Sequence, residues 1–257
     1  MADNSHRSVI AVIPARYASS RFPGKPLAPI AGRPMIQHVF ERARQSQRAS
    51  RVVVATDDQR IREAVEAFGG EAVMTRSVHR TGTDRIAEVA IHIPADAYVN
   101  VQGDLPLIRP EVIDAAIDAL LAAPTDVHVA TLCVPITARE EIMNPNIVKV
   151  VSDFDGNALY FSRAPIPWVR DAGAHVTARF FKHIGLYAFR RDALLEFPAL
   201  PPGELERVEQ LEQLRWMENS YRIAVAEAEA YEGVEVDLPA DVARVEALLR
   251  SKASAAE

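Results

Sequence analysis

Three basic side chains follow the first apolar segment of the chain at short spacing. The segment PARYASSRFPGKPL places Arg16, Arg21 and Lys25 between Pro14 and Pro26. Arginine binds phosphate oxygens with a planar fork and lysine places a point charge on them, while the prolines disfavour a helix. We therefore predict that this loop holds the phosphates of a nucleoside triphosphate. The loop contains neither GxxxxGK[ST] nor GxGxxG, and a solvated basic loop is the alternative interpretation.

Two carboxylates are expected where predicted strands end. Asp104 follows the segment YVNVQG, and Asp237 follows VEV. Because Mg²⁺ prefers one or two carboxylates together with phosphate oxygens, Asp104 facing a triphosphate would hold the metal and Asp237 would supply a second ligand. The structural alternative for Asp104 is a turn residue before Pro106. For Asp237 it is a helix cap before Pro239, which the local sequence favours and which only proximity in space can decide.

Two further groups of polar residues have side chains that suit ligand binding. The segment MTRSVHRTGTDR offers donors to a base or a ribose near a predicted helix start, from Arg76, Gly82, Thr83 and Asp84. A second set consists of Arg163, His183, Tyr187, Glu212 and Gln213. Together these side chains could recognise a small acidic, polyhydroxylated molecule, with the arginine paired with its carboxylate and the others with its hydroxyls. Singly, each has a structural explanation, such as a core histidine for His183 or the solvated face of a helix for Glu212 and Gln213.

Alternating apolar and amphipathic segments predict the elements that position these residues. In the first half we expect strands at residues 8–14, 51–56, 71–75 and 97–102, and helices at 34–47, from Asp57 or Asp58 to Gly69-Gly70, at 83–93 and at 110–122. Repeated βα units predict a parallel sheet with helices on both faces. Such a sheet binds its ligand at the carboxyl ends of the strands.

The second half has a different pattern. We expect strands at residues 127–136, 147–153, 158–163, 182–189 and 221–226, a polar loop at 171–176, and helices at 191–197, 204–219 and 239–249. Asp155-Gly156 is a typical hairpin turn. The helix at 204–219 is expected to bury Leu205, Val208, Leu211 and Leu214, and the last helix Val242, Val245, Leu248 and Leu249. The tail from Ser251 is expected to fray.

Composition excludes several classes of function. The chain has 257 residues, of which 49% are hydrophobic and 25% charged, with a net charge of −6. This balance disfavours wholesale nucleic-acid binding. The single cysteine, Cys133, lies in an apolar segment and reads as a small buried residue. Because we find no secretion signal and no segment long enough to span a bilayer, we expect a cytoplasmic protein.

The motifs, taken together, resemble the family of 3-deoxy-manno-octulosonate cytidylyltransferases (CMP-Kdo synthetases). The resemblance covers residues from about Val9 to Leu249, through the segments PARYASSRFPGKPL, ATDD, RTGTDR, VNVQGDLP, NPNIVKVV, ALYFSRAPIPW, KHIGLYAFR, LEQLRW and VDLP. The first segment alone is typical of the wider group of sugar nucleotidyltransferases. FSRAPIPW, HIGLY and LEQLRW are specific to the Kdo enzymes.

The resemblance implies a fold, a reaction and its partners. The fold would be α/β: a single Rossmann-like nucleotidyltransferase domain over residues 1–257, with a mostly parallel central sheet, helices on both faces and a smaller mixed subregion in the second half. Residues from about 127 to 226 would contribute sugar-acid binding and dimer contacts. The enzyme would be a homodimer that uses CTP, Kdo and Mg²⁺ to make CMP-Kdo and pyrophosphate for lipopolysaccharide biosynthesis.

The same resemblance assigns roles to the candidate residues. Arg16, Arg21 and Lys25 would hold the triphosphate, and Gln102 and Arg76 would lie near the nucleoside. Asp104 and Asp237 would hold Mg²⁺, and the catalytic residues would be Lys25, Arg21 and Asp104. The sugar acid would be held by Arg163, His183, Tyr187, Glu212 and Gln213.

Two departures from the family pattern are visible, and they bear on the alternatives. Leu105 stands where the family usually has Glu in QGDEP, but Asp104 is retained, so metal binding is expected to survive. The stretch between Trp168 and Phe181 is short for the family. The alternative substrates are an amino-Kdo analogue and a sialic-type acid. A non-catalytic nucleotide-binding protein is a remote alternative, which the joint presence of Lys25, Asp104 and Asp237 disfavours.

Overall fold

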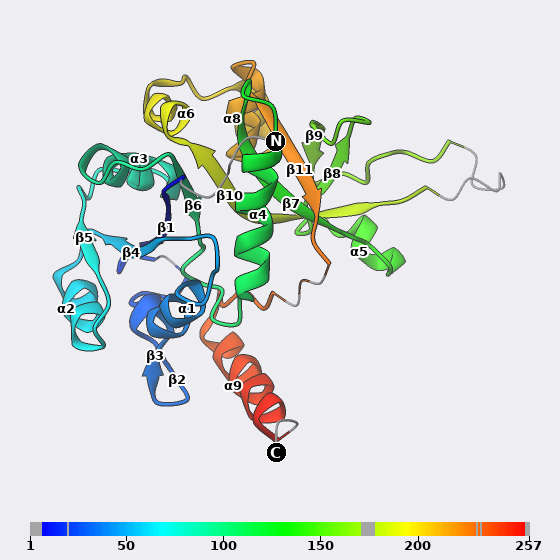
Figure 1. Cartoon of the computed structure of the whole chain (residues 1–257). Coiled ribbons are helices and arrows are strands. Elements are labelled where there is room, and N and C mark those ends of the chain that lie inside the picture. The colour runs from blue at the N-terminus through cyan, green and yellow to red at the C-terminus, as the bar shows by residue number, and fades with distance from the viewer. Residues whose placement is uncertain (1–6, 20, 171–177, 230, 232, 255–257) are drawn as a thin grey trace. The chain divides into compact units, whose positions relative to one another are not determined.

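The computed structural model describes residues 7–19, 21–170, 178–229, 231 and 233–254, and side chains up to Ser251. The chain forms two compact units, Met1–Asp114 together with Glu232–Glu257, and Ala115–Tyr231. Their elements are labelled in Figure 1.

The first unit contains a parallel sheet with the strand order β6-β1-β4-β5. Its strands are β1 (Val9–Ala15), β4 (Arg51–Thr56), β5 (Ala72–Met74) and β6 (Ala97–Asn100). Its helices are α1 (Met35–Ala43), α2 (Gln59–Ala67), α3 (Gly82–His92) and α9 (Pro239–Ser254), and α4 (Pro110–Ala122) begins there. A short 3-10 helix, η1 (Lys25–Leu27), and the hairpin of β2 (Pro29–Ile30) and β3 (Arg33–Pro34) connect β1 to α1.

The direction of the crossovers decides where a ligand can bind in this unit. From β1 the chain passes through α1 and α2 outward to β4 and β5, and then returns through α3 to β6 on the other side of β1. Because parallel crossovers are right-handed, the outward helices and the returning helix cover opposite faces, as Figure 1 shows for α1 and α2 against α3. The strand order therefore reverses between β1 and β6. The loops after these two strands meet at the position where such sheets bind ligands.

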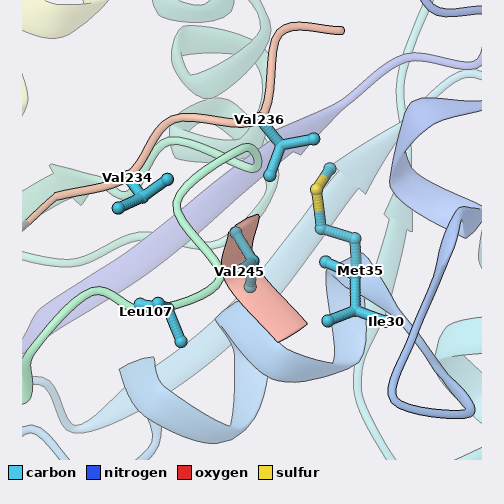
Figure 2. Packing of buried hydrophobic residues seen from close by; sticks show 6 residues of the cluster. All are labelled: Ile30, Met35, Leu107, Val234, Val236 and Val245. Carbon is cyan, nitrogen blue, oxygen red and sulfur yellow. The ribbon is translucent and has the colours of Figure 1, made fainter. Parts of the chain in front are cut away.

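The C-terminal segment packs into the first unit through a small apolar cluster. Ile30, Met35, Leu107, Val234, Val236 and Val245 form this cluster, which Figure 2 shows. Val236 is fully buried, so the residue that follows it, Asp237, is held at a fixed place beside the loop after β6. Burying an aliphatic side chain contributes about 1.5–3 kcal/mol, so Val234 and Val236 both stabilise the extended segment in this position.

The second unit is the smaller mixed subregion. Its strands are β7 (Val127–Pro135), β8 (Lys149–Ser152), β9 (Ala158–Ser162), β10 (Phe181–Arg190) and β11 (Arg222–Glu227). Its helices are α5 (Arg139–Met143), α6 (Arg191–Glu196), the 3-10 turn η2 (Phe197–Ala199), α7 (Glu204–Glu209) and α8 (Gln213–Glu218). β11 pairs parallel with β7, whereas the pairs β7–β10, β10–β8 and β8–β9 are antiparallel. The predicted α/β fold, with a mostly parallel sheet and an antiparallel subregion, is confirmed.

The continuous helix predicted over residues 204–219 is wrong. Gln210 adopts a left-handed conformation with φ of 54° and ends α7. The chain then turns back, because the Glu218 carboxylate accepts the N–H groups of Leu205 and Glu206. Leu205 and Val208, expected on the buried face, are 41% and 74% exposed. The helical spacing of apolar residues continues across the break between α7 and α8, which we call the α7–α8 joint. It does not reveal this break, because the contacts that stabilise the break join residues 12 and 13 apart in sequence.

Two helix ends also differ from expectation. α1 stops at Ala43 rather than near Gln47, because the Asp114 carboxylate accepts hydrogen bonds from Ser46 Oγ and from the N–H groups of Gln47 and Arg48. These bonds stabilise a turn in place of another helical turn. α9 continues through Ser254, so the tail does not fray from Ser251. The predicted loop at residues 171–176, and much of the stretch between Trp168 and Phe181, lies outside the described residues.

Two smaller expectations concern Cys133 and the membrane. Cys133 is buried, and burial raises the pKa of its thiol to about 11, so the thiol stays protonated. Among the residues that the structure describes, no helix combines the length and apolar character needed to cross a bilayer. The cytoplasmic location stays a prediction.

Candidate active site

The two predicted metal carboxylates and the predicted phosphate lysine meet at one point of the first unit. Lys25 Nζ lies 2.9 Å from the Asp104 carboxylate and 3.6 Å from the Asp237 carboxylate. Arg21 Nη1 donates to Asp237 at 2.9 Å. One ammonium group thus contacts both carboxylates, although Asp104 and Asp237 are far apart in sequence. This proximity favours a shared role for the two aspartates over the turn and helix-cap alternatives, and the metal role stays a prediction.

Backbone packing brings these three residues together. A Cβ on Gly103 would lie 2.9 Å from the Pro14 carbonyl, so the loop after β6 approaches the end of β1 at a distance that only glycine permits. Val236 N–H donates to the Asp104 carbonyl at 3.0 Å. The Asp241 carboxylate accepts the N–H group of Asp237 at 2.9 Å, so Asp241 stabilises the start of α9 and leaves the Asp237 carboxylate for Lys25 and Arg21.

The basic loop is folded back on itself. The Tyr17 carbonyl accepts the N–H group of Gly24 at 2.8 Å, and Gly24 has a φ of 73°, which favours glycine. The Arg60 guanidinium lies 3.3 Å from the centre of the Tyr17 ring, a cation–π contact. The loop therefore has its own stabilising contacts before any ligand binds. Ser20 lies outside the described residues.

Arg16 is connected to the start of α3. Its Nη2 donates to the Thr81 carbonyl at 2.9 Å. Thr81 is the N-cap of α3 and forms a capping box with Asp84, so the structural role of Asp84 accounts for its position. The free N–H groups of a helix start attract anions, and Arg16 lies beside them.

The remaining two predicted nucleotide residues also belong to the first unit. Arg76 is exposed, and its backbone N–H donates to the Glu88 carboxylate at 3.1 Å, with its Nε 3.5 Å from the same oxygen. Gln102 lies two residues after the end of β6, and its carbonyl accepts the N–H group of Leu105 at 3.3 Å. Leu105 is 2% exposed, so the residue that departs from the family pattern is a core residue of this turn.

All five predicted sugar-acid residues belong to the second unit, and three of them, His183, Tyr187 and Glu212, lie close together there. The rings of His183 and Tyr187 are 5.4 Å apart on β10, and the negative charge of Glu212 acts on Tyr187. Burial lowers the pKa of His183 to about 3, so the imidazole is neutral at physiological pH. Burial first, and then Glu212, raise the pKa of Tyr187 well above its usual value, so the phenol keeps its proton.

The hydrogen bonds of this group define which atoms are available. Thr131 Oγ1 is 2.9 Å from His183 Nε2 and also donates to backbone carbonyls of β10. Gln213 is 5% exposed, and its Nε2 has no hydrogen-bond partner. A buried amide donor without a partner is uncommon and costs free energy. Gln213 is therefore suited to donate to a ligand.

Arg163 lies at the end of β9, beside the α7–α8 joint. Its guanidinium donates to the carbonyls of Pro145, Glu209 and Gln210 at 3.0, 2.7 and 3.3 Å. An arginine has five N–H donors, so these three bonds leave two for a ligand. Arg163 thus connects the joint that precedes Glu212 and Gln213 to β9.

Several residues that support these groups were not found from the sequence. The buried Arg85 pairs with the partly exposed Asp57 at the carboxyl ends of the strands of the first unit, and Thr131 bonds to His183 in the second. Arg85 is the last residue of the RTGTDR segment. The sequence of this segment does not indicate that the Arg85 side chain is buried. The described residues contain no cluster of three or more metal-ligating side chains, so any cation at Asp104 and Asp237 would have two protein carboxylates.

The comparisons with known proteins decide the family. The family model described as Cytidylyltransferase matches residues 10–223. A 3-deoxy-manno-octulosonate cytidylyltransferase from Geobacter metallireducens is 52% identical over 245 residues, which cover 92% of this chain and 96% of the relative. One from Syntrophotalea carbinolica is 53% identical over 249 residues, covering 95% and 99%. The chain belongs to the 3-deoxy-manno-octulosonate cytidylyltransferases. The predicted family and enzyme class are confirmed.

Solved structures agree with this cytidylyltransferase assignment. A CMP:2-keto-3-deoxy-manno-octonic acid synthetase in complex with CTP superposes with a TM-score of 0.90 and 47% identity, covering 95% of this chain and 99% of that one. A 4-diphosphocytidyl-2C-methyl-D-erythritol synthase from Anaerococcus prevotii superposes with a TM-score of 0.62 at 14% identity, which shows a shared fold alone.

Proposed function

We propose that this cytidylyltransferase transfers CMP from CTP to the anomeric hydroxyl of Kdo, producing CMP-Kdo for lipopolysaccharide biosynthesis. A bond forms between the anomeric oxygen and the α-phosphorus, the bond from that phosphorus to the bridging oxygen breaks, and pyrophosphate leaves. The names of close relatives and the CTP in a solved relative support the reaction. The observation that carries the proposal is the convergence of Lys25, Asp104 and Asp237 at the switch point of the sheet.

The nucleotide half of the reaction is assigned to the first unit. Arg16, Arg21 and Lys25 bind the triphosphate, and Arg76 and Gln102 lie near the nucleoside. Lys25 and Arg21 are already oriented toward one point, so only a change of partner is needed for them to neutralise the charge of the departing pyrophosphate. The pairing with Asp104 and Asp237 holds both cations in place until phosphate oxygens replace the carboxylates as their partners.

The carboxylates Asp104 and Asp237 fit a divalent cation, for which we propose Mg²⁺. Both are oxygen donors, both are partly exposed at 29% and 36%, and both already share one cationic neighbour. Two carboxylates completed by phosphate oxygens are a common Mg²⁺ ligand set. A cation held there neutralises phosphoryl charge and lowers the pKa of a coordinated hydroxyl. The protein's own part is to hold the two carboxylates at the end of the phosphate loop.

The sugar acid is assigned to the second unit. Arg163 pairs with the carboxylate of the acid, and His183, Tyr187, Glu212 and Gln213 bind its hydroxyls. Because the Thr131 hydroxyl proton goes to backbone carbonyls, neutral His183 donates its Nε2–H to Thr131 and leaves Nδ1 as an acceptor, whereas protonated Tyr187 is a donor. Glu212 accepts, whereas Gln213 contributes its unpartnered buried amide. This mixture of donors and acceptors matches a polyhydroxylated ligand.

We also propose that residues from about 127 to 226 supply the contacts of a homodimer. Leu159, Trp168 and Val208 are 60%, 76% and 74% exposed in this unit. Large apolar side chains exposed to this degree are available for contact with a protein partner. Sedimentation at several concentrations would measure the association. A monomer at every concentration would contradict this part of the proposal.

Pyrophosphate release with CTP and Mg²⁺ tests the reaction and the acceptor together. The panel contains Kdo, an amino-Kdo analogue and sialic acid. We expect release with Kdo. If pyrophosphate is released only with the amino-Kdo analogue, or only with sialic acid, that compound and not Kdo is the substrate. If no pyrophosphate is released with any of the three, the enzymatic function is rejected in favour of nucleotide binding alone.

A further inference from the structure

Arg85 is a charged side chain that the first unit encloses completely. Its exposed fraction is 0%, and it lies in the first turn of α3 beside the buried Ile86. Burying a guanidinium costs free energy unless it is paired. Burial lowers its pKa and Asp57 opposes that change. The contacts of Arg85 must therefore explain why a charge is placed there.

The contacts of Arg85 reach two neighbouring strands. Its Nη2 lies 3.3 Å from the Asp57 carboxylate, and its Nη1 donates to Thr75 Oγ1. Asp57 directly follows β4, and Thr75 directly follows β5. The guanidinium is incompletely bonded, since its Nε has no hydrogen-bond partner and its Nη2 contacts Asp57 as an ion pair without hydrogen-bond geometry. One planar group thus ties the carboxyl ends of β4 and β5 to the start of α3.

The start of α3 in turn holds Arg16. Thr81 precedes Arg85 by about one helical turn, and its carbonyl accepts from Arg16 Nη2 at 2.9 Å. The capping box between Thr81 and Asp84 makes this turn rigid. A displacement of Arg85 would therefore move the Thr81 carbonyl and the guanidinium that it orients.

We infer that Arg85 is a positioning residue for nucleotide binding: it fixes the first turn of α3 against Asp57 and Thr75, and so orients Arg16. Arg85 acts through Thr81 and Arg16 and has no contact with the nucleotide. The inference rests on the proposed function, in which Arg16 binds the triphosphate.

Equilibrium binding of CTP by calorimetry tests this role. Arg85→Met and Arg16→Met are each expected to raise the Kd of CTP about tenfold or more, since losing one charge-assisted hydrogen bond to a phosphate has an effect of this size. The double variant should bind CTP no more weakly than Arg16→Met alone, because Arg85 acts through Arg16. Arg85→Lys should remain weaker than the native protein, because an ammonium lacks the planar fork. In steady-state kinetics, the Arg85 variants should have a higher KM for CTP than the native protein and an unchanged KM for Kdo.

A control separates positioning from stability. Arg190→Met removes another structural arginine, whose Nε donates to the Val127 carbonyl at 2.9 Å, and should leave the Kd of CTP unchanged. If Arg85→Met does not fold, Arg85→Lys replaces it in the same cycle with Arg16→Met. Additive losses in the double variant, or native CTP affinity in folded Arg85 variants, would overturn the inference. If the native protein itself binds no CTP, the proposed function fails instead.

Discussion

Replacing Lys25 with methionine separates the two charges that meet at the candidate active site. The ammonium lies 2.9 Å from Asp104 and 3.6 Å from Asp237, and its side chain is 16% exposed. Without nucleotide, Lys25 therefore occupies the position of a cation between the proposed metal ligands. Lys25→Met removes the charge and keeps most of the apolar stem, so the packing around it is disturbed little.

Lys25→Met is expected to weaken catalysis and to strengthen metal binding. Loss of a charged contact to the leaving group should lower kcat by about 10²–10³. Loss of two partly exposed ion pairs should destabilise the fold by only about 1 kcal/mol. Charges about 4 Å apart near a protein surface interact by about 4 kcal/mol. Removing the Lys25 charge leaves both carboxylates free to attract an added cation. If the cation regains even a third of this interaction energy, its Kd becomes about tenfold lower.

Titration with Mn²⁺, followed by electron paramagnetic resonance in the absence of nucleotide, measures this directly. Lys25→Met should bind Mn²⁺ about tenfold more tightly than the native protein. The matched control is Lys182→Met, which removes the ammonium that pairs with Glu141 at 3.3 Å and should leave Mn²⁺ affinity unchanged. Native Mn²⁺ affinity together with near-native kcat in Lys25→Met would refute the reasoning.

Three further predictions follow from individual side chains. Asp104→Asn should nearly abolish turnover with an unchanged circular dichroism spectrum, and near-native turnover would remove Asp104 from the mechanism. Gly103→Ala should destabilise the fold by about 1–3 kcal/mol in urea unfolding, since its Cβ would lie 2.9 Å from the Pro14 carbonyl, whereas Gly185→Ala meets nothing within 4 Å and should cost less. For His183, the folded-state pKa of about 3 lies below the unfolded value near 6.5, so the unfolded state binds the extra proton between these values. Stability should therefore fall as pH drops below 6.5, by at most about 1.4 kcal/mol per pH unit, and an imidazole NMR signal that titrates near pH 6.5 would contradict this.

Local patterns predicted the parallel half of the fold because its determinants are local. Buried strands such as β1 are continuous apolar segments, and α4 was predicted with its observed bounds, Pro110–Ala122. The joint at Gln210 could not be predicted in this way. Its left-handed turn is stabilised by Glu218, which reaches back to a helix start earlier in the chain.

The candidate site shows the same division. The residue types of Arg16, Lys25 and Asp104 point to phosphate and metal chemistry from the sequence alone. The role of Asp237 required proximity, because a helix cap was the favoured local interpretation and only tertiary packing places its carboxylate against Lys25. Arg85 was missed for a related reason: a charged residue in a polar segment is usually exposed, and its burial depends on Asp57 in another element.

The central claim is that the chain joins CMP to an acceptor, and the products of one reaction mixture test it most directly. We expect phosphorus NMR of CTP, Kdo and Mg²⁺ with the enzyme to show a new phosphodiester signal that grows together with the pyrophosphate signal, with one phosphodiester formed for each pyrophosphate. Neither signal should grow without Kdo. Pyrophosphate that forms at the same rate without Kdo, accompanied by free CMP, would contradict transfer to the sugar acid and indicate hydrolysis of CTP.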